Sequence, residues 1–247
     1  MRVHGALVAL IDMPRELTAE YNRWYDLDHM PEHVSKRDVL LGRRYVAPRD
    51  LQGAGSVDGD IIAEHAPYLT IYYFGIPDFD SEDAWSGWTV KDRGLVKAGR
   101  FFREGRVVKS DQWRAAGAQT RPSVLVSEEA VPYLAHRGVI VAIGRAPSAE
   151  QRADALRWWD DVHLPDLFAI DGVLAAMRFD PVGDAAPELV LHVLLLDADP
   201  AAVMPRIDES RRFAGATGRY PPHGGVYEPL AFLPYRAVQP LDYDFDF

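Results

Sequence analysis

Residues 24–32 read Trp-Tyr-Asp-Leu-Asp-His-Met-Pro-Glu, and residues 158–166 read Trp-Trp-Asp-Asp-Val-His-Leu-Pro-Asp. The shared tryptophan, aspartate, histidine and proline stand at a constant offset of 134 residues (Trp24 to Trp158), and the match continues without a gap over 23–45 and 157–179. A repeat with so long a period decides the architecture of a chain. Because two copies are too few for a solenoid, the pattern indicates a duplicated domain whose copies pack about a pseudo-two-fold axis, as the subunits of a homodimer do.

The similarity extends to both sides of this stretch. Residues 5–14 align with 138–147 after a slip of one residue, and residues 67–76 align with 187–196. Each copy has a normal length for a domain with its own hydrophobic core. We therefore predict a first repeat over 1–114, a linker over 115–137, a second repeat over 138–235, and an acidic tail over 236–247 that is either loose or docked by its aromatic rings.

Each copy is predicted to contain six elements in the order β-α-β-β-α-β, the ferredoxin-like unit. In the first copy, an apolar run at 6–11 predicts a strand, and a helix follows from an N-cap at Thr18 to His29, where Pro31 would end it. A glycine- and aspartate-rich loop over 49–66 is inserted in the first copy alone. The other elements predicted in the first copy are strands at 39–46, 69–74 and 106–113 and a helix at 82–98. In the second copy, strands are predicted at 139–143, 174–179, 189–196 and 226–233, and helices at 148–163 and 201–214. The first of these two helices begins with a capping box formed by Ser148 and Gln151.

The composition excludes several classes of function. The 247 residues include no cysteine, which excludes disulfide bonds, thiolate catalysis and cysteine-ligated zinc. The net charge of −10 argues against a nucleic-acid partner, because phosphate backbones bind basic surfaces. No apolar stretch reaches the roughly 18 residues of a membrane span, and the N-terminus lacks the features of a signal peptide. We expect a cytoplasmic protein that meets no membrane and binds a small-molecule substrate, and a homodimer stays open.

The stretch at 24–32, followed by Gly-Arg-Arg-Tyr at 42–45, resembles EthD-like members of the dimeric α/β-barrel superfamily, and the second copy carries the same pattern. The resemblance covers the core of both copies. It implies an α+β fold in which two tandem ferredoxin-like repeats form an intramolecular dimeric α/β barrel that encloses a pocket. It leaves the reaction open, because the superfamily is similar in fold to cofactor-free monooxygenases, cyclases, isomerases, decarboxylases, haem-binding enzymes and proteins without known activity.

The aspartate and histidine of the repeated motif are candidate catalytic residues. Asp26 and His29 stand three residues apart on a predicted helix, so their side chains can meet, and Asp160 and His163 repeat this spacing. A carboxylate beside an imidazole raises its basicity and fixes its tautomer, as a general base requires. The alternative is structural, because a histidine in a last helical turn can bond free carbonyl groups and complement the helix dipole. Of the two histidines, we expect His163 to matter for turnover.

Four further motif residues are candidate substrate contacts. Arg44 and Arg178 occupy matched positions on the second strand of each copy. Such an arginine could hold a carboxylate or enolate oxygen of the substrate, or else form a salt bridge to the motif aspartate of its own copy. Trp24 and Trp158 are either core residues or a platform on which the substrate lies.

The third strand is where the two copies differ. Tyr72 in the first copy corresponds to His192 in the second, and both interrupt apolar strands. A polar residue in such a strand needs a hydrogen-bonding partner or a cavity. We predict that both face a pocket between the sheet and its covering, Tyr72 as a substrate contact and His192 as a catalytic residue. A hydrogen-bonded core position is the alternative.

These residues predict a cofactor-independent enzyme with acid–base chemistry of the isomerase, cyclase or lyase type. Its substrate would be a small, apolar, aromatic or polyketide-like molecule held in the barrel pocket. The sequence has no glycine-rich nucleotide motif and no tight histidine spacing, so we expect no cofactor and no metal site. Haem is the alternative cofactor, because it needs a single axial histidine. The alternative functions are a non-catalytic small-molecule binding protein and, within the same fold, a cofactor-free monooxygenase or a haem-binding enzyme.

Overall fold

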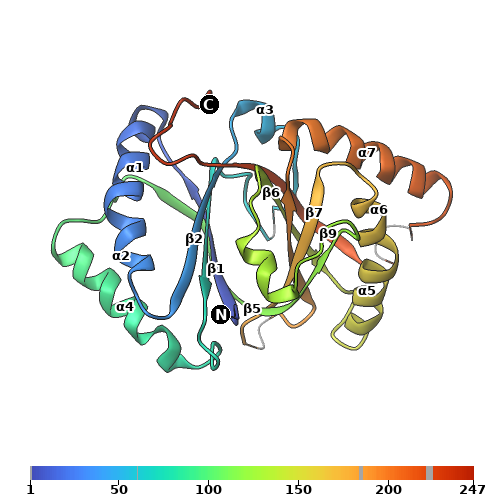
Figure 1. Ribbon diagram of the computed structural model, residues 1–247, viewed down its shortest axis with the longest axis horizontal. Helices are drawn as coiled ribbons and strands as arrows, with labels where there is room; N and C mark the ends of the chain where they lie inside the picture. The colour runs from blue at the N-terminus through green and yellow to red at the C-terminus, as the bar shows by residue number, and fades with distance from the viewer. Residues whose placement is uncertain (1, 60, 184–185, 221–224) are drawn as a thin grey trace.

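The computed structural model describes residues 2–59, 61–183, 186–220 and 225–247, and Figure 1 shows its helices on the outside of a curved central sheet. The first half contains the strands β1 (Gly5–Asp12), β2 (Val39–Val46), β4 (Tyr68–Phe74) and β5 (Arg106–Thr120) and the helices α1 (Thr18–Trp24), α2 (Met30–Val34) and α4 (Glu82–Lys97). The second half contains β6 (Gly138–Arg145), β7 (Val173–Pro181), β8 (Leu189–Leu196) and β9 (Glu228–Ala237), with α5 (Arg152–Trp158), α6 (Leu164–Phe168) and α7 (Pro200–Ala216).

Over the described residues, these long strands form one antiparallel sheet that closes on itself. The order is β2-β4-β1-β5 in the first half and β7-β8-β6-β9 in the second, so both halves arrange their strands in the same way. β5 pairs with β7, where Ala118 lies opposite Met177, and β2 pairs with β9, where Tyr45 lies opposite Ala237. The two halves are therefore joined at both ends. The predicted β-α-β-β-α-β order is confirmed in each half.

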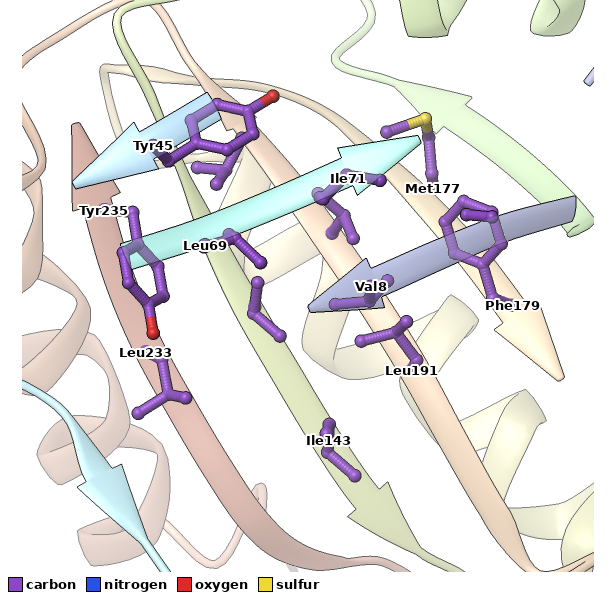
Figure 2. Close-up of a cluster of buried hydrophobic side chains, with 14 of the residues drawn as sticks. Val8, Tyr45, Leu69, Ile71, Ile143, Met177, Phe179, Leu191, Leu233 and Tyr235 are labelled. Carbon is purple, nitrogen blue, oxygen red and sulfur yellow. The ribbon is translucent and has the colours of Figure 1, made fainter. Parts of the chain in front are cut away.

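The interior of this closed sheet is filled by apolar side chains. Figure 2 shows side chains from both halves gathered there, among them Val8, Tyr45, Leu69, Ile71, Ile143, Met177, Phe179, Leu191, Leu233 and Tyr235. A barrel of about eight strands has an interior just wide enough for side chains to fill. The interior is therefore a core, and the prediction that it holds the substrate pocket is wrong.

The outward-facing residues of each strand lie beneath the helices. Ile71 and Leu191 belong to the interior core, whereas their neighbours Tyr72 and His192 face the helices with 2% and 1% of their surface exposed. In Figure 1, α1, α2 and α4 cover the first half of the sheet, and α5, α6 and α7 cover the second. Each covered face has its own apolar core. Strand alternation therefore predicted the face of both residues correctly.

Each first helix continues beyond its last predicted residue through a π turn. α1 passes through the π turn Tyr25–His29 into α2, and α5 passes through the π turn Trp159–His163 into α6. The prediction that the motif prolines end these helices is wrong, because each proline lies in the first turn of the following short helix, where it breaks no intrahelical bond. His29 and His163 consequently lie inside a helical segment, so they do not cap a last turn.

The starts of the first helices also differ from the prediction. A 3-10 turn (Arg15–Leu17) precedes α1, and the hydroxyl of Thr18 donates to the carbonyl oxygen of Arg15 (2.7 Å). Thr18 is thus the first residue of the helix and not its N-cap. In the second half, the amide of Gln151 donates to the hydroxyl of Ser148 (3.4 Å), which is one half of the predicted capping box, and α5 begins directly afterwards.

The segment inserted in the first half forms regular structure. It contains α3 (Arg49–Gln52) and the two-residue strand β3 (Ser56–Val57), which pairs with β9. Leu51, Ile62 and Ala66 are fully buried and join the interior core. The prediction of an irregular loop failed because these apolar residues stand between its glycines and aspartates and give the segment a surface to bury.

The C-terminal tail docks on the first half, and Figure 1 shows it crossing toward α1. Tyr243 donates a hydrogen bond from Oη to Oδ2 of Asp26 (2.6 Å), and the amide of Leu241 donates to the same oxygen (3.0 Å). The ring of Phe247 packs against that of Tyr68, with centroids 5.5 Å apart. Of the two alternatives for the tail, docking by aromatic residues is the one that the structure confirms.

Candidate active site

A cavity of about 640 Å³ lies on the helix-covered face of the second half. Ala142 on β6 and Phe232 on β9 lie on its sheet side, and the π turn after α5 and the helix α7 form the opposite walls. Its volume falls within the roughly 300–1,000 Å³ of small-molecule sites. The aromatic and polar side chains that line it are Trp158, Trp159, His163, Arg211, Tyr220 and Tyr227.

Local backbone structure brings these side chains together. Trp158, Trp159 and His163 reach the cavity from the π turn and the residue before it, and single π turns inside helices are frequent at functional sites. On the opposite wall, Gly144 allows the ring of Tyr227 to lie directly against β6, because a Cβ at this position would overlap the ring. The shape of the cavity therefore depends on a residue without a side chain at position 144.

His163 is a buried, neutral imidazole held by a tyrosine. It is 4% exposed, and its Nδ1 lies 2.6 Å from Oη of Tyr220. Its ring is parallel to that of Trp158, with centroids 5.3 Å apart, and meets the edge of Trp159 at 4.5 Å. Burial, and then the positive charge of Arg211, lower the pKa of His163 from 6.5 to about 3. The imidazole is therefore neutral throughout the physiological pH range.

Tyr220 keeps its proton in this environment. Burial raises the pKa of Tyr220 to about 12, and the negative charge of Asp166 acts in the same direction. Asp166 is itself paired with Arg219, whose Nη2 lies 2.8 Å from Oδ1. The hydrogen bond between Tyr220 and His163 thus joins two neutral groups, so it fixes the orientation of the imidazole without charging it.

Three polar atoms of the lining residues have no hydrogen-bonding partner within the described part of the chain. They are Nε1 of Trp158, Nε1 of Trp159 and Oη of Tyr227, and all three are buried. A buried polar group left unpaired costs roughly 1–3 kcal/mol, so native structures satisfy nearly all of them with protein, water or ligand. The cavity wall therefore offers two indole N–H donors and a hydroxyl to a bound molecule.

His192 lies behind Trp159, beside a second and smaller cavity. Its ring stacks on the indole of Trp159 with centroids 3.8 Å apart and planes at 10°. Neither ring nitrogen of His192 has a hydrogen-bonding partner among the described residues, and burial lowers its pKa well below the usual value. The adjoining cavity of about 240 Å³ is also lined by Asp160 and Arg178. His192 therefore faces this polar cavity and is separated from the larger one by an indole ring.

The motif carboxylates turn toward arginines and not toward the histidines. Asp26 accepts a hydrogen bond from Nη1 of Arg44 (2.6 Å), and Asp160 accepts one from Nη1 of Arg178 (2.9 Å). The prediction that each aspartate orients its neighbouring histidine is wrong, because the π turn changes the angle between residues three positions apart. The alternative of an aspartate–arginine salt bridge is confirmed in both halves.

The corresponding space in the first half is filled by aromatic rings. His29 packs against Trp24 with centroids 4.5 Å apart and against Phe101 at 5.6 Å. The indole of Trp24 also donates to the carbonyl of Arg100 (2.9 Å), which closes this side. Tyr72 donates weakly to Oη of Tyr25 (3.4 Å) inside the same aromatic core. Trp24 and Tyr72 are thus part of a packed layer, whereas Trp158 lines an open cavity.

Three of the polar and aromatic residues that line the main cavity were not predicted from the sequence. Arg211, Tyr220 and Tyr227 lie outside the ungapped match between the copies, so the repeat drew no attention to them. The one available signal was the pair of tyrosines on either side of a proline- and glycine-rich stretch of sequence in the second copy. Nothing in the sequence around Arg211 distinguishes it from the other arginines of α7.

Over the described residues, no group of three or more histidine, aspartate or glutamate side chains is arranged to hold a metal ion. In the same part of the chain, no helix is both long enough and apolar enough to cross a membrane.

The chain is similar to solved structures across almost its whole length, although no family model and no curated protein matches it. An anthrone oxidase-like protein shares 14% sequence identity with a TM-score of 0.54, over 97% of this chain and 92% of that one. A monooxygenase-like protein from Fusobacterium nucleatum gives 10% identity and a TM-score of 0.52, over 98% and 99%. A chlorite dismutase variant from Candidatus Nitrospira defluvii gives 11% and 0.51, over 97% and 93%.

At these identities the likeness concerns the fold and not the reaction. All three neighbours have the dimeric α/β-barrel architecture, and the closed antiparallel sheet with helices on its outer faces agrees with it. The chain therefore has an α+β fold with a large antiparallel sheet that is similar to the fold of these neighbours, and its chemistry follows from its own residues.

Proposed function

We infer that the cavity beneath α7 is an active site that removes a proton from an aromatic, polyketide-like carbon acid, with His163 as the general base. The observation that carries this proposal is the neutral imidazole of His163, fixed by Tyr220 inside an aromatic cavity. A general base needs an unprotonated nitrogen at working pH and a fixed orientation. The apolar rings around it suit a planar, aromatic substrate.

In the proposed mechanism, Nδ1–H of His163 donates to Tyr220, and Nε2 accepts the proton from the substrate carbon. A buried imidazole with a pKa of about 3 is a weak base in the empty cavity. Proton transfer turns the substrate into an enolate and His163 into an imidazolium at the same time. Burial disfavours either charge alone, but the negative enolate and the positive imidazolium stabilise each other. Nε1 of Trp158 and Oη of Tyr227 are among the wall groups that can bond to substrate oxygens.

The carbanion formed in this step can react in two ways. Reprotonation at another carbon, or loss of a group, gives the isomerase, cyclase or lyase outcome without a cofactor. Reaction of the carbanion with dioxygen gives a cofactor-free oxidation, which the anthrone oxidase-like neighbour makes the natural alternative. Both outcomes share the proton abstraction by His163, so that step is the one to test first.

The test uses anthrone, whose methylene group between two aromatic rings is acidic. Exchange of these protons with deuterium is followed by NMR, and oxygen uptake is measured in parallel. We expect His163→Asn to slow the exchange by about 10²–10⁴, the usual contribution of a general base. The matched control is His29→Asn in the filled first half, which should exchange as the wild type does. Wild-type binding of anthrone without exchange would refute the base and favour a non-catalytic binding protein.

Haem is a second candidate, supported by the same neutral imidazole. Iron is bound by uncharged imidazole, and His163 is uncharged in an apolar cavity, so the chain offers one residue that fits an axial ligand. His163 would hold the iron through the ring nitrogen that does not face Tyr220, and the haem would supply redox chemistry. Haem titration followed by visible absorption decides this: a shifted spectrum in the wild type and a free-haem spectrum in His163→Asn would support haem.

We also infer that the chain arose by tandem duplication of one EthD-type unit, with repeats over 1–114 and 138–235 and a linker over 115–137. The shared strand order and the π turn at the same motif support this proposal. Superposition of the two halves checks it, because the repeats should place His29 on His163.

A further inference from the structure

The helix α7 carries one arginine to the wall of the cavity. Arg211 is half-buried, and its Cζ lies 3.8 Å from the ring centroid of Phe232. The flat guanidinium therefore lies on the flat ring of a core residue of β9. This contact is favourable and fixes the group, but it satisfies none of its N–H donors. Across the described residues, Arg211 makes neither an ion pair nor a hydrogen bond.

Several other arginines of this half are paired with carboxylates. Arg178 pairs with Asp160, Arg152 pairs with Asp180, and Arg219 pairs with Asp166. Among the described residues, no carboxylate pairs in this way with Arg211 at the cavity.

The guanidinium of Arg211 places a positive charge at the cavity wall that no described carboxylate neutralises. Burial lowers the pKa of Arg211, and the nearby groups Tyr220, Asp208 and Tyr227 act in the opposite direction without pairing with it. A half-buried cation without a counter-charge is unfavourable unless something in the cavity supplies one. The same positive charge contributes to the lowered pKa of His163, so the two side chains share one electrostatic environment.

We propose that Arg211 is an anion subsite of this cavity, which binds the carboxylate or phenolate oxygen of a planar aromatic ligand. The aromatic part of the ligand would lie among Trp158, Trp159 and Tyr227, and the N–H edge of the guanidinium would meet its oxygen. This inference rests on the proposed function for the location of the substrate, and it deepens that proposal by assigning the substrate a negative charge. Because the guanidinium is already fixed against Phe232, little side-chain entropy is lost on binding.

The experiment compares two probes of the same shape, anthracene-9-carboxylate and anthracene-9-carboxamide, by fluorescence titration. We expect the wild type to bind the carboxylate roughly 10- to 100-fold more tightly than the carboxamide, as a charge-assisted hydrogen bond implies. Arg211→Met should lose this preference, and Arg211→Lys should keep part of it. The matched control is Arg212→Met, because Arg212 is the exposed neighbour on α7 and donates to the carbonyl of Asp208 on its own helix.

Three results would overturn the subsite: equal affinity of the wild type for both probes, an unchanged preference in Arg211→Met, or an equal loss in Arg212→Met. Thermal unfolding of each variant checks that it is folded. If Arg211→Met does not fold, the carboxylate preference of Arg211→Lys still tests the subsite. The titration needs no turnover, so it is independent of the general base. If His163→Asn keeps the carboxylate preference while proton exchange is unaffected, the base proposal fails and the subsite stands.

Discussion

Lowering the pH from 7 to 5 should destabilise this protein through its buried histidines, and the size of the effect follows from their surroundings. The pKa of His163 is about 3 in the folded protein, because burial disfavours its charged form, and His29 has a pKa of about 3 for the same reason. In the unfolded chain a histidine titrates near 6.5. Between these two values the unfolded state binds a proton that the folded state does not, so stability falls as the pH falls below 6.5.

At pH 5, each of these histidines lowers the free energy of unfolding by roughly 2 kcal/mol, since 1.5 pH units correspond to about 1.36 kcal/mol each. The assay is urea unfolding of the wild type and of His163→Gln at pH 7 and pH 5. The carboxylates titrate alike in both proteins, so the difference between the two pH dependences isolates His163. We expect the loss between pH 7 and pH 5 to be roughly 2 kcal/mol smaller in the variant. An identical loss in both proteins would mean that His163 titrates normally and is not kept neutral by its burial.

Three further predictions concern the site and its supports. The kcat/KM of proton exchange should stay constant from pH 8 down to about 5, because the free enzyme needs a neutral His163 whose pKa is about 3; an acid limb near 6.5 would contradict this. Gly144→Ala should displace the ring of Tyr227, destabilise the fold by about 1–3 kcal/mol in thermal unfolding, and weaken binding of anthracene-9-carboxylate; unchanged binding would show that the wall tolerates the methyl group. Arg44→Met should destabilise more than Arg178→Met, by about 3–5 kcal/mol against about 1 kcal/mol or less, because its carboxylate partner is 9% exposed and that of Arg178 is 30% exposed; equal losses in denaturant titrations would refute this order.

The arrangement of strands was predictable because their apolar runs are short, bounded and repeated. Residues 39–46 and 189–196 match β2 and β8 along their whole lengths, and the alternation at Tyr72 and His192 placed both on the correct face. These features depend on local periodicity, which a single sequence displays directly. The closing pairs between the two halves, such as Tyr45 with Ala237, involve residues far apart in the chain and had to come from the resemblance.

The site was less predictable, because its residues meet through tertiary structure. The repeat identified His163 and Trp158, but it paired Asp160 with the histidine, and the π turn directs that carboxylate to Arg178. Arg211 gives no local signal, since its distinguishing property is the lack of an ion-pair partner among the described residues of the folded protein. An unsatisfied cation is a feature of the folded surroundings and not of the residues beside it in sequence.

The closure of both halves into one chain changes what evolution can do with the fold. In a homodimer of identical subunits, every substitution appears twice, so both sites open or close together. Here β5–β7 and β2–β9 link two halves whose residues vary independently. In the first half, aromatic rings pack tightly around His29. In the second half, a cavity remains open beside His163. The binding stoichiometry should therefore be one ligand molecule per chain, at the His163 cavity.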